Sequence, residues 1–127
     1  MIKYTIKTTN LGSTPALDQF VESKVKAISR FVDKNDASAI ADVEIGKISD
    51  HHRRGEIFRA EFNVSLAHHK LFRAEETQTD LYNAINNAKN EVIRQIKATK
   101  NKQETLTKRG GRQLKNILRG WNPRQKN

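Results

Sequence analysis

The sequence contains no cysteine, only two prolines and no long apolar run. The absence of cysteine excludes disulfides, zinc–thiolate sites and thiol catalysis. No segment approaches the roughly 18 apolar residues that are needed to span a bilayer. The N-terminus reads MIKYTIKTTN and therefore lacks the apolar core of a signal peptide. We expect a cytoplasmic protein that consists of one ordinary domain with an extension.

Acidic residues are scarce in the last quarter of the chain, and this locates the net charge of +10. Residues 1–96 carry 14 Lys/Arg and 13 Asp/Glu, whereas residues 97–127 carry 10 Lys/Arg and the single acid Glu104. A block of one charge sign is typical of a segment that binds a polyanion. A disordered, solubilising tail is the alternative.

The tail also carries apolar residues at helical spacing, which argues against a purely solubilising role. Gly110 and Gly111 precede these residues, and we expect the two glycines to act as a hinge. Residues 104–127 would then form a basic tail with a short amphipathic helix, which Gly120 and Pro123 would end. The predicted apolar anchor of this tail consists of Leu114, Ile117, Leu118 and Trp121.

Alternation of apolar and polar residues predicts four strands in the rest of the chain. They cover roughly residues 2–8, 41–45, 58–66 and 71–76. Apolar residues at steps of three and four predict two helices, over residues 15–32 and 79–102. The candidate N-caps are Thr14 for the first helix and Thr77 or Thr79 for the second.

The element order β-α-β-β-β-α predicts an α+β fold, in which two helices pack on one face of a four-stranded sheet. The opposite face would carry four cations and four anions: Lys3, Lys7, Arg59, Arg73, Asp42, Glu44, Glu61 and Glu75. Opposite charges on neighbouring strands form modest pairs, and aromatic residues are few on this face. We therefore expect no base stacking on the sheet.

Cationic residues remain near the ends of both helices and in the tail, where we interpret them as contacts to RNA phosphates. The candidate RNA-binding residues are Lys24, Lys26, Arg30, Lys89, Arg94, Lys97, Lys100, Lys102, Lys108, Arg109, Arg112, Lys115 and Arg119. The alternative for the helix cations is an ordinary solvated face. In the tail, Trp121 could stack on a base or pack on a protein partner.

No residue pattern indicates an enzyme, a cofactor or a small-molecule substrate. The pairs His51-His52 and His68-His69 are the only histidines. Adjacent residues on a strand point in opposite directions, so neighbouring histidines rarely bind one ion together. We expect exposed loop histidines and no metal site.

The segment RAEETQTDLYNAI (residues 73–85) resembles the signature of the ribosome hibernation-promoting factor family. That family includes ribosome-associated inhibitor A and the sigma-54 modulation proteins. Its members typically have Asp-Met-Tyr-x-Ala-Ile at the start of the last helix, and Leu81 replaces the methionine here. VIRQIK (92–97) is similar to the family's Leu-x-Arg-Gln-Leu pattern, and TPAL (14–17) to its Thr-x-Ala-Leu pattern. The resemblance covers residues 1 to about 102.

This resemblance implies a fold similar to that of double-stranded-RNA-binding domains. It implies that residues 1–103 bind the small ribosomal subunit between head and body, cover the mRNA path and the A- and P-site tRNA positions, and stop translation under stress. By length the chain resembles the short forms of the family, and we expect a monomer when it is free. Ala27 and Glu91 stand where relatives usually have lysine. The residues that fall on family cationic positions facing ribosomal RNA are Lys24, Arg30, Arg94 and Lys102.

Two other functions stay open on the sequence alone. A general double-stranded-RNA-binding protein or RNA chaperone would bind free duplexes as tightly as ribosomes. A membrane-surface or protein-interaction module built on the tail helix would bind without RNA. Because the apolar stripe of the tail has only four large residues, we expect no stable membrane anchoring.

Overall fold

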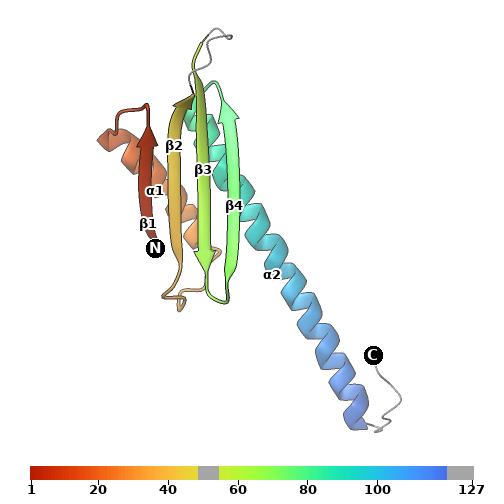
Figure 1. Cartoon of the computed structure of the whole chain (residues 1–127). Helices are drawn as coiled ribbons and strands as arrows, with labels where there is room; N and C mark the ends of the chain where they lie inside the picture. The colour runs from red at the N-terminus through yellow and green to blue at the C-terminus, as the bar shows by residue number, and fades with distance from the viewer. Residues whose placement is uncertain (49–54, 120–127) are drawn as a thin grey trace. The chain divides into compact units, whose positions relative to one another are not determined.

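The chain folds in the predicted order of strands and helices (Figure 1). A computed structural model describes residues 1–48 and 55–119, with side chains described as far as residue 102. The elements are β1 (Lys3–Thr9), α1 (Pro15–Ser29), β2 (Ile40–Ile48), β3 (Ile57–Leu66), β4 (Lys70–Gln78) and α2 (Leu81–Arg119). The predicted α+β class is confirmed.

The four strands form one sheet in the order β1-β2-β3-β4. β1 and β2 are parallel because α1 carries the chain back to the end where β1 began. β3 is antiparallel to both β2 and β4. Consequently β1, β2 and β4 run in one direction, and α1 and α2 both return against it. The C-terminal turn of α1 and the stretch of α2 that ends at Ile96 therefore lie toward the same end of the sheet.

Both helices cover the same face of the sheet (Figure 1). Alternate residues of β3 are fully buried against them, as the apolar pattern predicted: Ala60, Phe62 and Val64. The helices contribute Leu17, Val21, Val25, Ile28, Ala84, Ile85, Ala88, Val92 and Ile96 to the same core. Burial of each large apolar side chain stabilises the fold by about 1.5–3 kcal/mol. This layer therefore fixes the two helices against the sheet.

The two helices begin at residues with capping side chains. The Thr14 hydroxyl accepts a hydrogen bond from the Leu17 amide at 3.1 Å, as expected for an N-cap. In α2 the carboxylate of Asp80 accepts from the Tyr82 amide at 3.0 Å. The expected cap at Thr77 or Thr79 is wrong, because the backbone ladder of β4 continues to Gln78 and leaves Asp80 as the residue that precedes the helix.

The C-terminal helix is longer than predicted. α2 does not end near residue 102 but continues to Arg119, through Gly110 and Gly111. The prediction of a hinge at these glycines is therefore wrong, because the helical backbone continues through them. Each glycine costs about 1 kcal/mol in a helix, but the surrounding leucine, lysine, arginine and glutamine residues are good helix formers. The predicted separate tail helix is the last part of α2, and Gly120 and Pro123 lie outside the described residues.

By internal contacts the chain divides into two compact units, Met1–Ile96 and Lys97–Asn127. The first unit comprises the sheet, α1 and the beginning of α2, and the second contains the rest of α2. The functional boundary after residue 103 stays a prediction. Within the described ranges, no helix combines the length and the apolar character that crossing a membrane requires.

Candidate nucleic-acid interface

The face of the sheet that the helices leave open carries paired charges. Glu44, Glu61 and Glu75 lie opposite one another on three neighbouring strands. Arg59 contacts all three carboxylates, at 3.8 Å from Glu44, 2.5 Å from Glu61 and 2.8 Å from Glu75. Arg73 contacts Glu61 at 2.8 Å and Glu75 at 3.3 Å. The expected pairing of opposite charges across the strands is thus confirmed for both arginines.

These ion pairs shift the pKa values of the groups involved. A hydrogen bond from Arg73 lowers the pKa of Glu61, although burial of this carboxylate acts in the opposite direction. A hydrogen bond from Arg59 likewise lowers the pKa of Glu75. The carboxylates therefore stay ionised at neutral pH and compensate the two arginines. An incoming phosphate would have to displace them.

The helix layer presents a different surface, in which aromatic rings and a lysine lie together. The rings of Phe20 and Tyr82 meet edge to face, with centroids 4.7 Å apart and an interplanar angle of 89°. The Lys24 ammonium lies 4.6 Å from the centroid of the Phe20 ring, a cation–π contact. Because Tyr82 is 46% exposed, this aromatic contact between α1 and α2 is open to solvent.

The positive charge of Lys24 on α1 acts on Lys89 of α2. Partial burial lowers the pKa of Lys89, and the positive charge of Lys24 lowers it further. Among the described residues, neither lysine forms a salt bridge with a carboxylate. A bound anion would relieve the repulsion between the two ammonium groups. This pair is therefore suited to holding a phosphate.

The other cations of α1 lie near its C-terminal end and are exposed. Lys26 follows Lys24 by two residues, which is about 200° round the helix, so Lys26 points in a different direction. Arg30 is the C-cap of α1. Since the helices run in the same direction, Arg30 lies toward the same end as Arg94. The charge of Lys24 thus acts on Lys89, whereas Lys26 points away from Lys24.

Arg94 is engaged within the protein. Its guanidinium donates two hydrogen bonds to the carboxylate of Glu91, at 2.9 and 2.6 Å. The amide of Gln95 also donates to Glu91, at 3.3 Å, and to the backbone carbonyl of Arg73, at 2.9 Å. The spacing of three residues between Glu91 and Arg94 is a sequence signal for such a pair. A phosphate contact by Arg94 stays a prediction.

The remaining predicted residues belong to the second unit. Lys97, Lys100 and Lys102 lie on α2, and all three are exposed. Several others lie in the backbone of α2, with side chains outside the described residues: Lys108, Arg109, Arg112, Leu114, Lys115, Ile117, Leu118 and Arg119. Trp121 lies outside the described residues altogether. The roles of these residues stay predictions.

The aromatic contact between Phe20 and Tyr82 was not predicted from the sequence. The spacing of four residues between Phe20 and Lys24 is a usable signal, because such residues are neighbours on a helix. The approach of Tyr82 from the second helix depends on packing. In the part of the chain that the structure describes, no three potential metal-binding side chains gather into a group.

Comparison with known proteins places the chain in a family. Residues 4–104 match the family described as Sigma 54 modulation protein / S30EA ribosomal protein. The Ribosome hibernation promotion factor of Bacillus subtilis (strain 168) is 31% identical over 101 residues, which are 80% of this chain and 50% of that protein. The chain therefore spans about half the length of this relative.

Solved structures of similar proteins agree with this family assignment. The Protein Y N-terminal domain of Thermus thermophilus has a TM-score of 0.65 and 30% identity, covering 78% of this chain and 99% of that domain. A ribosomal subunit interface protein from Coxiella burnetii has a TM-score of 0.52 and 18% identity, covering 76% and 97%, and it supports the fold alone. The resemblance found in the sequence is confirmed, and the chain belongs to the Sigma 54 modulation protein / S30EA ribosomal protein family.

Proposed function

We propose that this protein is a ribosome hibernation factor. It binds the small ribosomal subunit at the decoding channel, covers the mRNA path and the tRNA positions, and blocks translation under stress. Family membership and the name of the Bacillus subtilis relative support the ribosome as partner. The observation that carries the proposal for this chain concerns Lys24 and Lys89: the charge of Lys24 lowers the pKa of Lys89, and neither lysine forms a salt bridge with a described carboxylate.

The first unit, Met1–Ile96, is called the body below. The contrast between its two faces supports a contact in which the helix layer faces the RNA. On the open face of the sheet, Arg59 and Arg73 are compensated by glutamates. On the helix layer, Lys24 and Lys89 are available to phosphates. Lysine contacts to phosphate carry no base identity, so the body would recognise the shape of folded ribosomal RNA. The helix layer is therefore the surface we assign to the RNA.

The exposed aromatic pair adds a second kind of contact. Tyr82 lies beside Phe20, and Phe20 holds the ammonium of Lys24 over its ring. An exposed aromatic ring next to a phosphate-binding lysine can stack on an unpaired base. In this proposal the protein acts by occupying space on the ribosome, as a monomer without a cofactor. The basic residues of the second unit add phosphate contacts.

Cosedimentation with purified small subunits tests the proposal. Lys24→Gln with Lys89→Gln keeps most of the aliphatic stems and removes both charges. The matched control is Lys3→Gln with Lys7→Gln, on exposed positions of β1. We expect the first variant to bind about tenfold more weakly or worse, because two cations no longer neutralise phosphates, and the control to stay within about twofold of the parent.

Competition identifies the place of binding. mRNA together with tRNA should displace the parent protein from the small subunit. A general double-stranded-RNA-binding protein would instead bind free duplexes with comparable affinity and would ignore this competition. Equal affinities of the parent and the Lys24/Lys89 variant would contradict the assigned surface.

A further inference from the structure

The hairpin between β3 and β4 turns through two histidines with left-handed backbone conformations. His68 has a φ of 64° and His69 a φ of 58°. Leu66 pairs with Lys70, so the loop has three residues, of which His68 and His69 are the last two. Histidine is among the non-glycine residues found more often with positive φ, but glycine adopts this conformation at lower cost. Two consecutive histidines therefore lower the stability of this turn. Disfavoured backbone of this kind is often retained where the side chains have a task.

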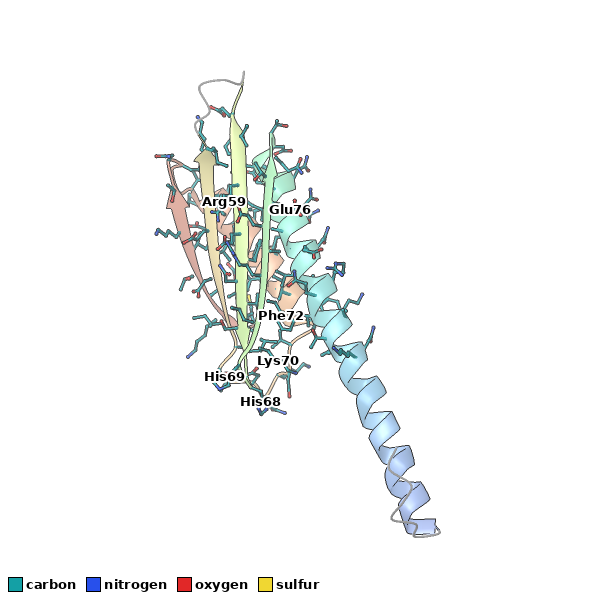
Figure 2. The ribbon with its side chains drawn as sticks, turned by 45° about the vertical axis from the view of Figure 1, so that its right-hand side comes forward. Arg59, His68, His69, Lys70, Phe72 and Glu76 are labelled. Atoms are coloured by element: carbon teal, nitrogen blue, oxygen red, sulfur yellow. The ribbon has the colours of Figure 1, made fainter. Side chains whose placement is uncertain are left out.

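The two histidines line a hollow of about 500 Å³ at the tip of the hairpin. Figure 2 shows His68, His69 and Lys70 following one another around this tip. Ser38 and Ser65 supply hydroxyl groups to the lining, and Leu66, Ala67 and Leu71 supply its apolar part. No carboxylate is among the described residues that line the hollow. The polar side of the hollow therefore consists of imidazole, ammonium and hydroxyl groups, which suit an anion.

One carboxylate nevertheless supports the tip from the α1–β2 connection. Asp36 accepts hydrogen bonds from the Ala67 amide at 2.8 Å and from Ser38, whose amide is at 3.0 Å and whose hydroxyl is at 2.6 Å. These bonds, led by the Ser38 hydroxyl, lower the pKa of Asp36. The positive charge of His68 contributes to lowering the pKa of Asp36 as well. Because three donors already occupy its oxygens, Asp36 stabilises the hairpin against the α1–β2 connection.

The tip lies at the end of the body where α1 finishes. Ser65 and Leu71, which flank the turn, are in register with Ile40 at the start of β2. The Ile2 amide donates to the Ser29 hydroxyl at 3.1 Å, so the start of β1 lies against the last turn of α1. Arg30 therefore lies at the same end as the hairpin. A polyanion that runs along the helix layer would meet this end.

We propose that His68, His69 and Lys70 form a phosphate-binding site for the RNA backbone, and that its affinity increases as the pH falls. Identification of the phosphate source as ribosomal RNA rests on the proposed function. Histidine is the ordinary side chain whose charge can change between about pH 5 and 8, and each proton gained at this tip would add a positive charge beside Lys70. Asp36 from the α1–β2 connection and Lys70 from β4 are the other charged groups at this site.

The decisive variant replaces the strained pair with residues that the turn prefers. His68→Asn with His69→Gly keeps the turn and removes both imidazoles. The matched control is His51→Asn with His52→Asn, which removes the other two histidines of the chain. Binding to small subunits is measured at pH 7.5 and 6.0 at constant ionic strength, together with the thermal midpoint. The parent protein and the control should bind about tenfold more tightly at pH 6.0.

The hairpin variant should lose most of this pH response, to less than about twofold, while its thermal midpoint rises by a few degrees. Higher stability with a lost pH response would separate a binding role from a structural one. A hairpin variant that retains the full response would overturn the inference. If the parent does not bind small subunits at either pH, the proposed function fails. In that case the inference is tested by following the NMR resonances of the His68 and His69 rings as a short RNA duplex is added at pH 6.0. We expect these resonances to shift, and unchanged resonances would overturn the inference.

Discussion

The guanidinium of Arg94 forms a two-point ion pair with the carboxylate of Glu91, with Nε 2.9 Å from Oε2 and Nη2 2.6 Å from Oε1. The Arg94 hydrogen bonds lower the pKa of Glu91 to about 2, and Gln95 adds to this effect. The carboxylate is therefore ionised throughout the physiological range. Arg94 is compensated within the protein, whereas Lys24 and Lys89 have no such partner among the described residues.

Removing the charge of Glu91 should strengthen ribosome binding. Glu91→Gln leaves Arg94 uncompensated, and we expect about three- to tenfold tighter binding to small subunits at physiological salt, because one more cation becomes available to a phosphate. Glu56→Gln is the control, since it breaks the pair with Lys47. If the Glu91→Gln variant bound small subunits as tightly as the parent, or more weakly, the assignment of Arg94 to the RNA surface would be contradicted.

The same pair should contribute to stability in a defined pH range. The pKa of Glu91 is lowered on folding, from 4.5 to about 2. Its contribution is therefore fully present above about pH 4.5 and is lost as the pH falls through 2. We expect the thermal midpoints of the parent and of Glu91→Gln to differ above pH 4.5 and to converge toward pH 2. A difference that does not change with pH would show that the pair is not the cause.

Glu61 should be the most important carboxylate for stability on the open face. It is only 6% exposed and accepts hydrogen bonds from Arg59, Arg73 and Asn63. We expect Glu61→Gln to lower the free energy of unfolding in urea by about 1–3 kcal/mol. The better exposed Glu75→Gln should lower it by less than about 1 kcal/mol. Ribosome binding by folded Glu61→Gln should be unchanged, and a large decrease would assign the open face to the RNA instead.

The glycines within α2 give a direct test of its continuity. Alanine is better than glycine in a helix by about 1 kcal/mol per residue. Gly110→Ala with Gly111→Ala should therefore increase the helical signal in far-ultraviolet circular dichroism. The control is Ser23→Ala, at an exposed position of α1, which should leave the signal almost unchanged. A reduced helical signal in the double variant would indicate that the glycines adopt a conformation that alanine cannot.

The basic second unit should contribute to the salt dependence of ribosome binding. Deleting residues 104–127 removes seven of the chain's Lys/Arg residues and one acid. We expect weaker binding and a smaller slope of log affinity against log salt concentration, by about 0.7–0.9 for each phosphate that the shortened chain no longer neutralises. An unchanged slope, measured between about 50 and 200 mM salt, would mean that this segment does not bind phosphates.

The architecture could be predicted because local pattern and tertiary burial agree. Phe62 and Val64 are both fully buried although they are two residues apart, since alternate residues of a strand share one face. The ends of elements were less predictable. Gln78 is polar and gives no apolar signal, yet it pairs with Phe58 because the backbone ladder does not depend on side chains.

The candidate site could be predicted only in part. The excess of positive charge and its place near the helix ends follow from composition and periodicity. The interaction of Lys24 with Lys89 is different, because these residues are far apart in the chain and act on each other only through the parallel packing of α1 and α2. The hollow at His68 and His69 likewise depends on the connection that carries Ser38, which approaches the hairpin only in the folded chain.

A density map of the protein bound to the small subunit would show directly which face meets the RNA. We expect the body in the decoding channel, with Lys24, Lys89 and Tyr82 against ribosomal RNA and the open face of the sheet turned away from it. A map that places Arg59 and Arg73 against the RNA, or the body outside the mRNA path, would contradict this expectation.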